Sequence, residues 1–115
     1  MIKTVFDINQ EERWPILIGN LKNLIKRTKE INLEYSLEVV ITNVAINGVK
    51  KGTNIIKKEY FEELVNEKVI FYVCNNTMNK FDIKKEELFD FIDIVPAGIV
   101  ELILKQQEGY SYIKS

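Results

Sequence analysis

The sequence predicts an α/β fold in which a mainly parallel sheet has helices on both of its faces. Short segments rich in β-branched and aromatic residues alternate along the chain with segments whose apolar residues recur at helical spacing. Parallel strands require such crossovers, which are nearly always right-handed. The 115 residues fit one domain, residues 1–115, which is large enough to bury a core without disulfides or metal.

The first strand is expected at residues 3–8, and a long helix follows it. Asn9 and Glu12 have the spacing of a capping box, so the helix begins between Asn9 and Trp14. It is expected to run to about Ile31, because an apolar stripe recurs at helical spacing and the charged residues lie largely outside that stripe. The stripe consists of Trp14, Leu17, Leu21, Leu24, Ile25 and Thr28.

The middle of the chain predicts a second strand, a loop and a second helix. Residues 34–42 are rich in β-branched and aromatic residues and form the strand. Residues 43–51 contain the turn dipeptide Asn47-Gly48, and residues 44–46 within them are either a short strand or part of a binding loop. Residues 57–67 have apolar residues at helical spacing and form a short helix.

The third strand is the stretch around which the remaining elements are arranged. Residues 69–73 are apolar or aromatic and predict a strand buried on both faces, which stops at Cys74 in a polar turn. The elements expected after this turn are a helix at residues 83–89 capped by Asp82, a strand at 92–95, a helix at 99–108 with Gly109 as its C-terminal cap, and a last strand at 110–114.

Composition and charge are those of an ordinary globular protein. Hydrophobic residues make up 46% and charged residues 29%, and the formal net charge is −1. This charge gives no general attraction to nucleic acid or to an anionic membrane. The chain has no basic leader with an apolar core and no apolar run near the ~20 residues of a membrane span. We therefore expect a soluble, cytoplasmic protein without nucleic-acid or membrane partners.

The cysteine and histidine counts exclude several kinds of site. The chain has one Cys and no His, which excludes an internal disulfide, a Cys/His zinc site and hydrolysis by a Cys/His pair. The turn after the first strand carries Asp7, Glu11 and Glu12 and no Gly, so it would repel the phosphate of a nucleotide or flavin. We therefore expect neither a cofactor nor a metal.

Cys74 is the candidate catalytic residue. It stands at the carboxyl end of an expected parallel strand, where α/β proteins bind ligands, and turn amides there lower a thiol pKa without a His partner. The chemistry left open is that of a persulfide, a mixed disulfide or an oxidation sensor. Asn75, Asn76 and Thr77 would orient a small group at the thiol. The alternatives are that Cys74 only fills a buried strand position and that the three residues after it only form a turn.

Four blocks of the sequence, taken in order, carry a family resemblance. They are Glu12-Arg13-Trp14-Pro15 with Gly19 to Leu24, Val73-Cys74-Asn75-Asn76-Thr77-Met78, Val95 to Leu102, and Gln107 to Ile113. Together they resemble the DsrE/DsrF-like family, and the Cys-Asn-Asn-Thr form resembles one branch of it. The resemblance implies a three-layer α/β/α fold with a five-stranded parallel sheet, a flavodoxin-like variant, and assembly into a homo-oligomer, either a trimer or a hexamer.

The same resemblance implies a function, because characterised relatives act in intracellular sulfur relay, where a cysteine matching Cys74 carries a persulfide between partner proteins. The leading hypothesis is an intracellular sulfur carrier of the sulfurtransferase type, with Cys74 receiving sulfur from a donor protein and passing it to an acceptor protein. The alternative is a non-catalytic module that binds a small ligand or serves in assembly.

Overall fold

The computed structural model describes residues 1–115 and contains one sheet of five strands. The strands lie in the order β4-β3-β2-β1-β5, and every neighbouring pair is parallel. The expected mainly parallel sheet is thus confirmed. The strands are β1 (Ile2–Ile8), β2 (Tyr35–Ile41), β3 (Ile70–Cys74), β4 (Asp93–Val95) and β5 (Ser111–Lys114).

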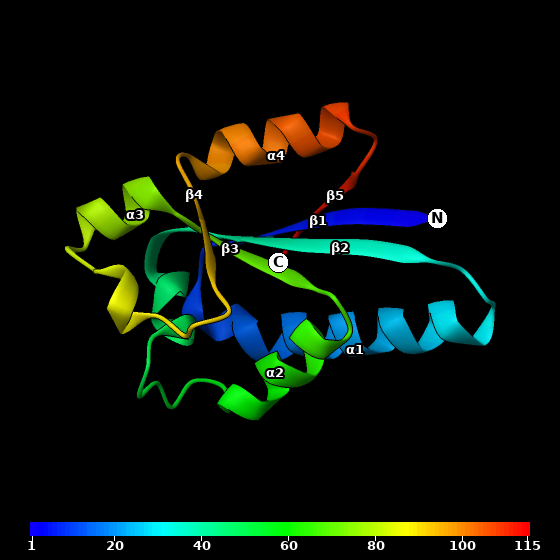
Figure 1. Ribbon diagram of the computed structural model, residues 1–115, viewed down its shortest axis with the longest axis horizontal. Helices are drawn as coiled ribbons and strands as arrows, with labels where there is room; N and C mark the ends of the chain where they lie inside the picture. Colours follow the sequence, from blue (N-terminus) through cyan, green and yellow to red (C-terminus); the bar gives the residue numbers. More distant parts are fainter.

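Helices lie on both faces of the sheet, as the sequence predicts. Figure 1 shows α1 and α2 along one face, α4 along the other, and α3 beyond the carboxyl end of β3. None of the helices combines the length and apolar character that a membrane span requires. The helices are α1 (Trp14–Glu30), α2 (Lys58–Asn66), α3 (Asn75–Lys80) and α4 (Gly98–Gln107), with 3₁₀ segments at Glu11–Arg13, Asn43–Val49 and Lys85–Glu87.

The main core lies between the sheet and the layer of α1 and α2. It joins 24 buried residues, and Trp14 is its largest fully buried side chain. The Trp14 ring packs edge-on against Phe61 with centroids 5.2 Å apart, and its Nε1–H donates a hydrogen bond to the Ala45 carbonyl oxygen at 2.8 Å. A Cβ on Gly48 would overlap the Trp14 indole. Trp14 therefore fixes the position of the segment Asn43–Val49, which follows the carboxyl end of β2.

The stripe predicted for the first helix is confirmed. It supplies most of the buried residues of α1, which are Trp14, Leu17, Ile18, Leu21, Ile25 and Thr28. The stripe packs against the sheet because α1 crosses from β1 to β2, which are neighbouring parallel strands.

On the opposite face of the sheet lies the single helix α4, and this helix turns charged residues toward the sheet. Lys105 of α4 pairs with the buried Glu38 of β2, Nζ to Oε2, at 3.2 Å, and with Glu101 at 3.7 Å. Burial acts to lower the pKa of Lys105, but the hydrogen bond and the charge of Glu38 outweigh it and raise that pKa. The buried apolar cluster on this face has only three members, Val5, Val40 and Leu102.

The polar turn expected after Cys74 is wrong, because residues Asn75–Lys80 form the helix α3. The burial expected for the third strand is also only partly correct. Its residues that face α1 and α2 are buried, whereas Ile70, on the α4 side, is 37% exposed and Tyr72 is half-buried. The single helix α4 therefore leaves part of the sheet face near β3 open.

The helix expected at residues 83–89 is wrong, since only one 3₁₀ turn forms there, at Lys85–Glu87. The backbone of residues 87–89 forms hydrogen bonds with the end of the Asn43–Val49 segment and the residues just after it, instead of within a helix. The Phe89 N–H donates to the Val49 carbonyl oxygen at 3.0 Å, and the Lys51 N–H donates to the Glu87 carbonyl oxygen at 2.8 Å. Asp82, the expected N-cap, has a left-handed φ of 51° at the end of α3.

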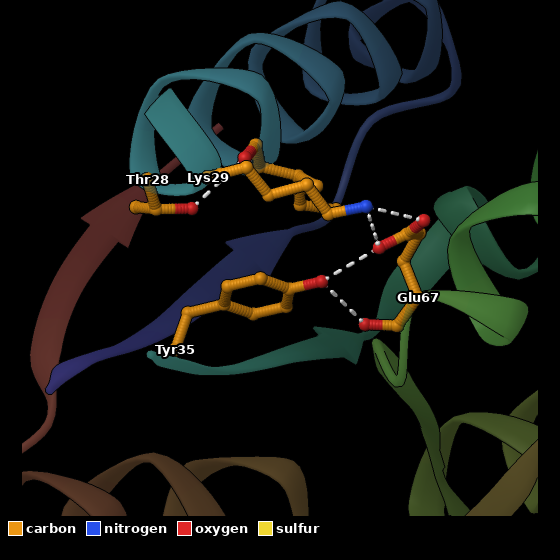
Figure 2. Close-up of polar contacts among 5 residues, drawn as sticks. Thr28, Lys29, Tyr35 and Glu67 are labelled. Atoms are coloured by element: carbon orange, nitrogen blue, oxygen red, sulfur yellow. Dashed lines mark hydrogen bonds and ion pairs between the residues drawn. The ribbon is translucent and has the colours of Figure 1, made fainter. Parts of the chain in front are cut away.

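A polar network joins α1, β2 and the turn after α2 at the amino end of β2 (Figure 2). Both carboxylate oxygens of Glu67 contact Lys29 Nζ, at 2.6 and 2.7 Å. The Tyr35 hydroxyl lies 2.9 Å from a carboxylate oxygen of Glu67 and 3.0 Å from its carbonyl oxygen. The Lys29 ammonium and the Tyr35 hydroxyl hold the pKa of the Glu67 carboxyl below its usual value.

We expect Trp14→Phe to lower the free energy of unfolding by about 2–4 kcal/mol, because it leaves the Ala45 carbonyl without its donor and opens a cavity in the main core. Urea unfolding followed by circular dichroism measures the change. Ile16→Ala, on the exposed side of the same helix, is the control and should shift the free energy by only about 0.5 kcal/mol. Equal losses in both variants would contradict the importance of Trp14.

We expect Glu67→Gln to lower the melting temperature at pH 7, and the gap from the wild type to narrow in acid. Because the pKa of Glu67 is lower in the folded protein, its carboxylate stabilises the fold at any pH above the unfolded-state pKa of about 4.3. This stabilisation is lost as the pH falls through the folded-state pKa. Thermal unfolding at several pH values between about 7 and 3 checks this. Glu62→Gln, whose carboxylate makes no ion pair, is the control. A gap that widens in acid would contradict the assignment.

Candidate functional site

Cys74 is the last residue of β3 and the N-cap of α3, so the strand passes directly into the helix. Its side chain points to the α4 side of the sheet, because it alternates with Phe71 and Val73, which lie in the main core. The thiol is therefore held at the carboxyl edge of the sheet, at the first turn of a helix, where backbone N–H groups have no partner within the helix.

A second helix, α4, also begins next to the sulfur atom of Cys74. Cys74 pairs with Val95 in the register of β3 and β4, and α4 begins three residues after Val95, at Gly98. The Gly98 N–H donates to Cys74 Sγ at 3.2 Å. A Cβ at position 98 would lie 2.9 Å from Thr42 Cγ2 and 3.3 Å from Cys74 Cβ. Only glycine therefore lets the start of α4 approach the thiol this closely.

The environment of Cys74 favours the thiolate. Burial acts to raise the pKa of the Cys74 thiol, since the charged form loses solvation. The backbone N–H groups of Gly98, Thr77 and Asn76, together with the Thr77 hydroxyl, outweigh this effect and bring the pKa below its ordinary value. The stabilisation comes from backbone dipoles and one hydroxyl, and no basic side chain takes part.

The three residues expected to orient a group at the thiol lie in two different places. Thr77 is buried, and its hydroxyl accepts a hydrogen bond from the Asn43 N–H at 3.1 Å, which links α3 to the segment after β2. Asn75 and Asn76 have exposed side chains without hydrogen bonds inside the protein. The backbone N–H of Asn76, and not its side chain, stabilises the sulfur.

Access to the thiol is narrow, and its surroundings are uncharged. Cys74 is only 6% exposed and lines none of the surface cavities. The three segments that meet at this edge, residues 42–49, 74–79 and 94–100, contain no charged residue, although 29% of the chain is charged. We call these segments the neutral collar. Its exposed apolar side chains include Val44 and Ile99.

The largest surface groove, of about 540 Å³, lies between α1 and α2, on the other side of the sheet from the thiol. Its lining is mostly charged and includes Lys22, Lys26 and Glu63. No group of three His, Cys, Asp or Glu side chains is close enough together to hold a metal ion. Cys74, and not this groove, is therefore the candidate functional site.

Gly98 is the residue of this site that the sequence reading does not identify. Its segment Pro96-Ala97-Gly98 reads only as a turn before a helix. The order β4-β3 brings that turn beside Cys74, and strand order does not follow from local pattern. The one feature of the sequence that marks the segment around Gly98 is that residues 94–100 carry no charge.

The fold and the site together define a class of protein: a parallel α/β/α domain that holds a thiol at the carboxyl edge of its sheet by backbone amides. The chain belongs to the DsrE/DsrF-like family, whose family model matches residues 16–115. The resemblance drawn from the four sequence blocks is thus confirmed. The family is linked in general to sulfur relay.

Solved structures of similar proteins share the fold. The protein of unknown function MTH1491 from Methanobacterium thermoautotrophicum is 26% identical, with a TM-score of 0.87 over the whole of both chains. The ychN protein from E. coli is 18% identical, with a TM-score of 0.72 over the whole of both chains. The conserved protein of unknown function BT1422 from Bacteroides thetaiotaomicron is 10% identical, with a TM-score of 0.73 over 98% of this chain and 94% of that one. No curated protein sequence matches the chain.

We expect Gly98→Ala to slow alkylation of Cys74 at pH 7 by roughly two- to fivefold, because the added methyl group lengthens the N–H to sulfur bond and reduces the thiolate fraction. Rates with iodoacetamide across a pH series measure both the rate and the thiol pKa, which should rise. Gly19→Ala is the matched control, because a Cβ at position 19 meets nothing within 4 Å. A Gly98→Ala protein that reacts like the wild type would refute this assignment.

Proposed function

We propose that the chain is a sulfur carrier in which Cys74 holds a sulfane sulfur as a persulfide. The observation that supports this most directly is the hydrogen bond from the Gly98 N–H to Cys74 Sγ, which, with the backbone amides of Asn76 and Thr77, brings the pKa of the thiol below its ordinary value. A thiolate stabilised without a basic side chain is a nucleophile toward sulfur. The general link of the DsrE/DsrF-like family to sulfur relay supports the same proposal.

The chemistry consists of two exchange reactions. In loading, the Cys74 thiolate attacks the terminal sulfur of a donor persulfide, a new S–S bond forms, the donor S–S bond breaks, and the donor leaves as a thiolate. In unloading, an acceptor thiolate attacks the terminal sulfur on Cys74, and Cys74 leaves as a thiolate. No external oxidant or reductant is required, because one S–S bond forms for each that breaks. The N–H groups stabilise Cys74 both as nucleophile and as leaving group.

The neutral collar suits a carrier that meets other proteins. A donor or acceptor protein reaches a thiol that is 6% exposed only by presenting its own sulfur on a projecting segment. The Asn75 and Asn76 amides at the rim are available to hydrogen-bond with that segment, and Val44 and Ile99 offer apolar contact. Recognition through amides and apolar side chains makes transfer insensitive to salt.

A non-catalytic binding or assembly module is the second candidate, and one observation favours it. Cys74 is almost buried and lines no cavity, as a cysteine that only packs the end of a strand would be. In this case the hydrogen bond from Gly98 would join two helices, and replacing Cys74 would leave the protein's activity unchanged.

The test is sulfur uptake by the folded protein. We expect incubation with glutathione persulfide to add one sulfur atom by intact-protein mass spectrometry, and dithiothreitol to remove it. Cyanide should also remove that sulfur, giving thiocyanate that is measured by colorimetry. Because Cys74 is the only cysteine, uptake reports on this site alone.

Cys74→Ser is the control and should take up no sulfur while it keeps the circular dichroism spectrum of the wild type. We expect Asn75→Ala to load normally from glutathione persulfide, because the Asn75 side chain does not contact the sulfur and this small donor has no projecting protein segment for the rim to bind. Uptake only after unfolding, or equal uptake by Cys74→Ser, would favour the assembly module over the carrier.

A further inference from the structure

Asn43 has a left-handed backbone conformation at a place where no helix ends. Four non-glycine residues have a left-handed φ. Three of them, Asn32, Lys68 and Asp82, directly follow the last cap residue of a helix, where this conformation is common. Asn43, with a φ of 53°, instead comes two residues after the end of β2. The conformation is costly for a residue with a side chain, and it persists where surrounding contacts impose it, often at functional sites.

Contacts on both sides of Asn43 hold it in this conformation. Just before it, the Thr42 N–H donates to the carbonyl oxygen of the last residue of β1 at 3.0 Å. Two residues after it, the Ala45 carbonyl oxygen accepts the hydrogen bond from Trp14 of the main core at 2.8 Å. The Asn43 N–H itself donates to Thr77 Oγ1 of α3 at 3.1 Å. The Asn43 side chain is exposed and takes part in no hydrogen bond, so the residue acts here through its backbone.

The Thr77 hydroxyl accepts the hydrogen bond from Asn43 and still has one hydrogen to donate. A Thr hydroxyl inside a helix often donates to a backbone carbonyl three or four residues earlier. Thr28 of α1 does so, to the Ile25 carbonyl oxygen at 2.9 Å. Thr77 makes no such bond, and it is only 7% exposed, so water has little access to its hydroxyl. Its hydrogen is therefore available to another acceptor nearby.

The sulfur atom of Cys74 is an acceptor in the right place. Cys74 is the N-cap of α3, and Thr77 is the third residue of that helix. The side chain of an N-cap residue lies close to the second and third residues of its helix. The Thr77 hydroxyl is accordingly among the groups that lower the pKa of the Cys74 thiol.

We propose that Asn43 is a positioning residue for Cys74. Its left-handed backbone holds its N–H on Thr77 Oγ1, and the hydroxyl hydrogen, which has to point away from that N–H, is thereby turned toward the Cys74 sulfur. Without this N–H the hydroxyl is free to rotate and to donate to a backbone carbonyl, as Thr28 does. The segment after β2, whose position Trp14 fixes, therefore contributes to the reactivity of the thiol.

This inference rests on the proposed function, because a sulfur carrier needs Cys74 as a thiolate, but its test uses no sulfur donor. Titration of the thiol reports on its hydrogen-bond donors, since the neutral collar around it has no charged residue. The first charged residue of α4 is Glu101, whose carboxylate pairs with Lys105. Failure of sulfur uptake and failure of this inference are therefore separate results.

The first test compares Asn43→Val with Asn43→Gly and with Asn32→Val. We expect Asn43→Val to raise the thiol pKa and to slow alkylation by iodoacetamide at pH 7 roughly two- to fivefold, because a β-branched residue does not tolerate a left-handed φ. Asn43→Gly should react like the wild type, since Gly adopts a positive φ without steric cost. Asn32 is the matched control, because it is also exposed, has a φ of 56° and lies beyond the end of α1, far from α3 (Figure 1). Asn32→Val should leave the thiol pKa unchanged.

The second test removes the hydroxyl that Asn43 positions. Thr77→Val should raise the thiol pKa and slow alkylation at least as much as Asn43→Val does. Thr77→Ser keeps the hydroxyl and should react like the wild type. The double variant Asn43→Val/Thr77→Val should react no more slowly than Thr77→Val alone, because both changes remove the same donor.

Three results would overturn the inference. The first is a wild-type thiol pKa in Asn43→Val, and the second is an equal shift in Asn32→Val, which would trace the effect to strain in general. The third is further slowing in the double variant, which would mean that Asn43 acts by a path other than Thr77. If Asn43→Val does not fold by circular dichroism, the Thr77 pair decides, and a Thr77→Val protein that titrates like Thr77→Ser overturns the inference.

Discussion

One hydrogen bond, from the Gly98 N–H to the Cys74 sulfur, joins the elements at the carboxyl edge of the sheet. It depends on the parallel pairing of β3 with β4, which sets Cys74 beside Val95, and on the missing side chain of Gly98. A shift of one residue in that register would turn Cys74 to the other face of the sheet. The site is therefore a property of the sheet as a whole, and the lowered pKa of the thiol follows from backbone geometry.

The two faces of the sheet are packed differently. The face toward α1 and α2 carries the main core of 24 buried residues, with Trp14 and its partners. The face toward α4 has a buried ion pair, Glu38 with Lys105, where an ordinary core would have apolar side chains. Replacing such a pair by apolar residues is often neutral or stabilising, so it is weak evidence for stability.

Local pattern in the sequence predicts the elements with a strong period and misses those that tertiary contact decides. The stripe beginning at Trp14 predicts α1 because its apolar spacing is regular over four turns. Asn75-Asn76-Thr77 reads as a turn, since these residues have modest helix propensity, but α3 forms against the thiol. The chain near Phe89 reads as a helix, but its backbone pairs with the Val49 region. The position of Cys74 at a strand end marks it as a candidate, whereas the role of Gly98 depends on the strand order, which local pattern does not predict.

The strand order also has a consequence for how the chain folds. The last strand, β5, pairs with the first, β1, and almost the whole sequence lies between them. Joining them closes the longest loop that the chain offers, and the entropy lost in that closure has to be offset by contacts already formed. The main core around Trp14 uses residues only up to Ile92, so it is able to assemble before β5 arrives. We therefore expect the edge strand next to β1 to be the part of the sheet that forms last.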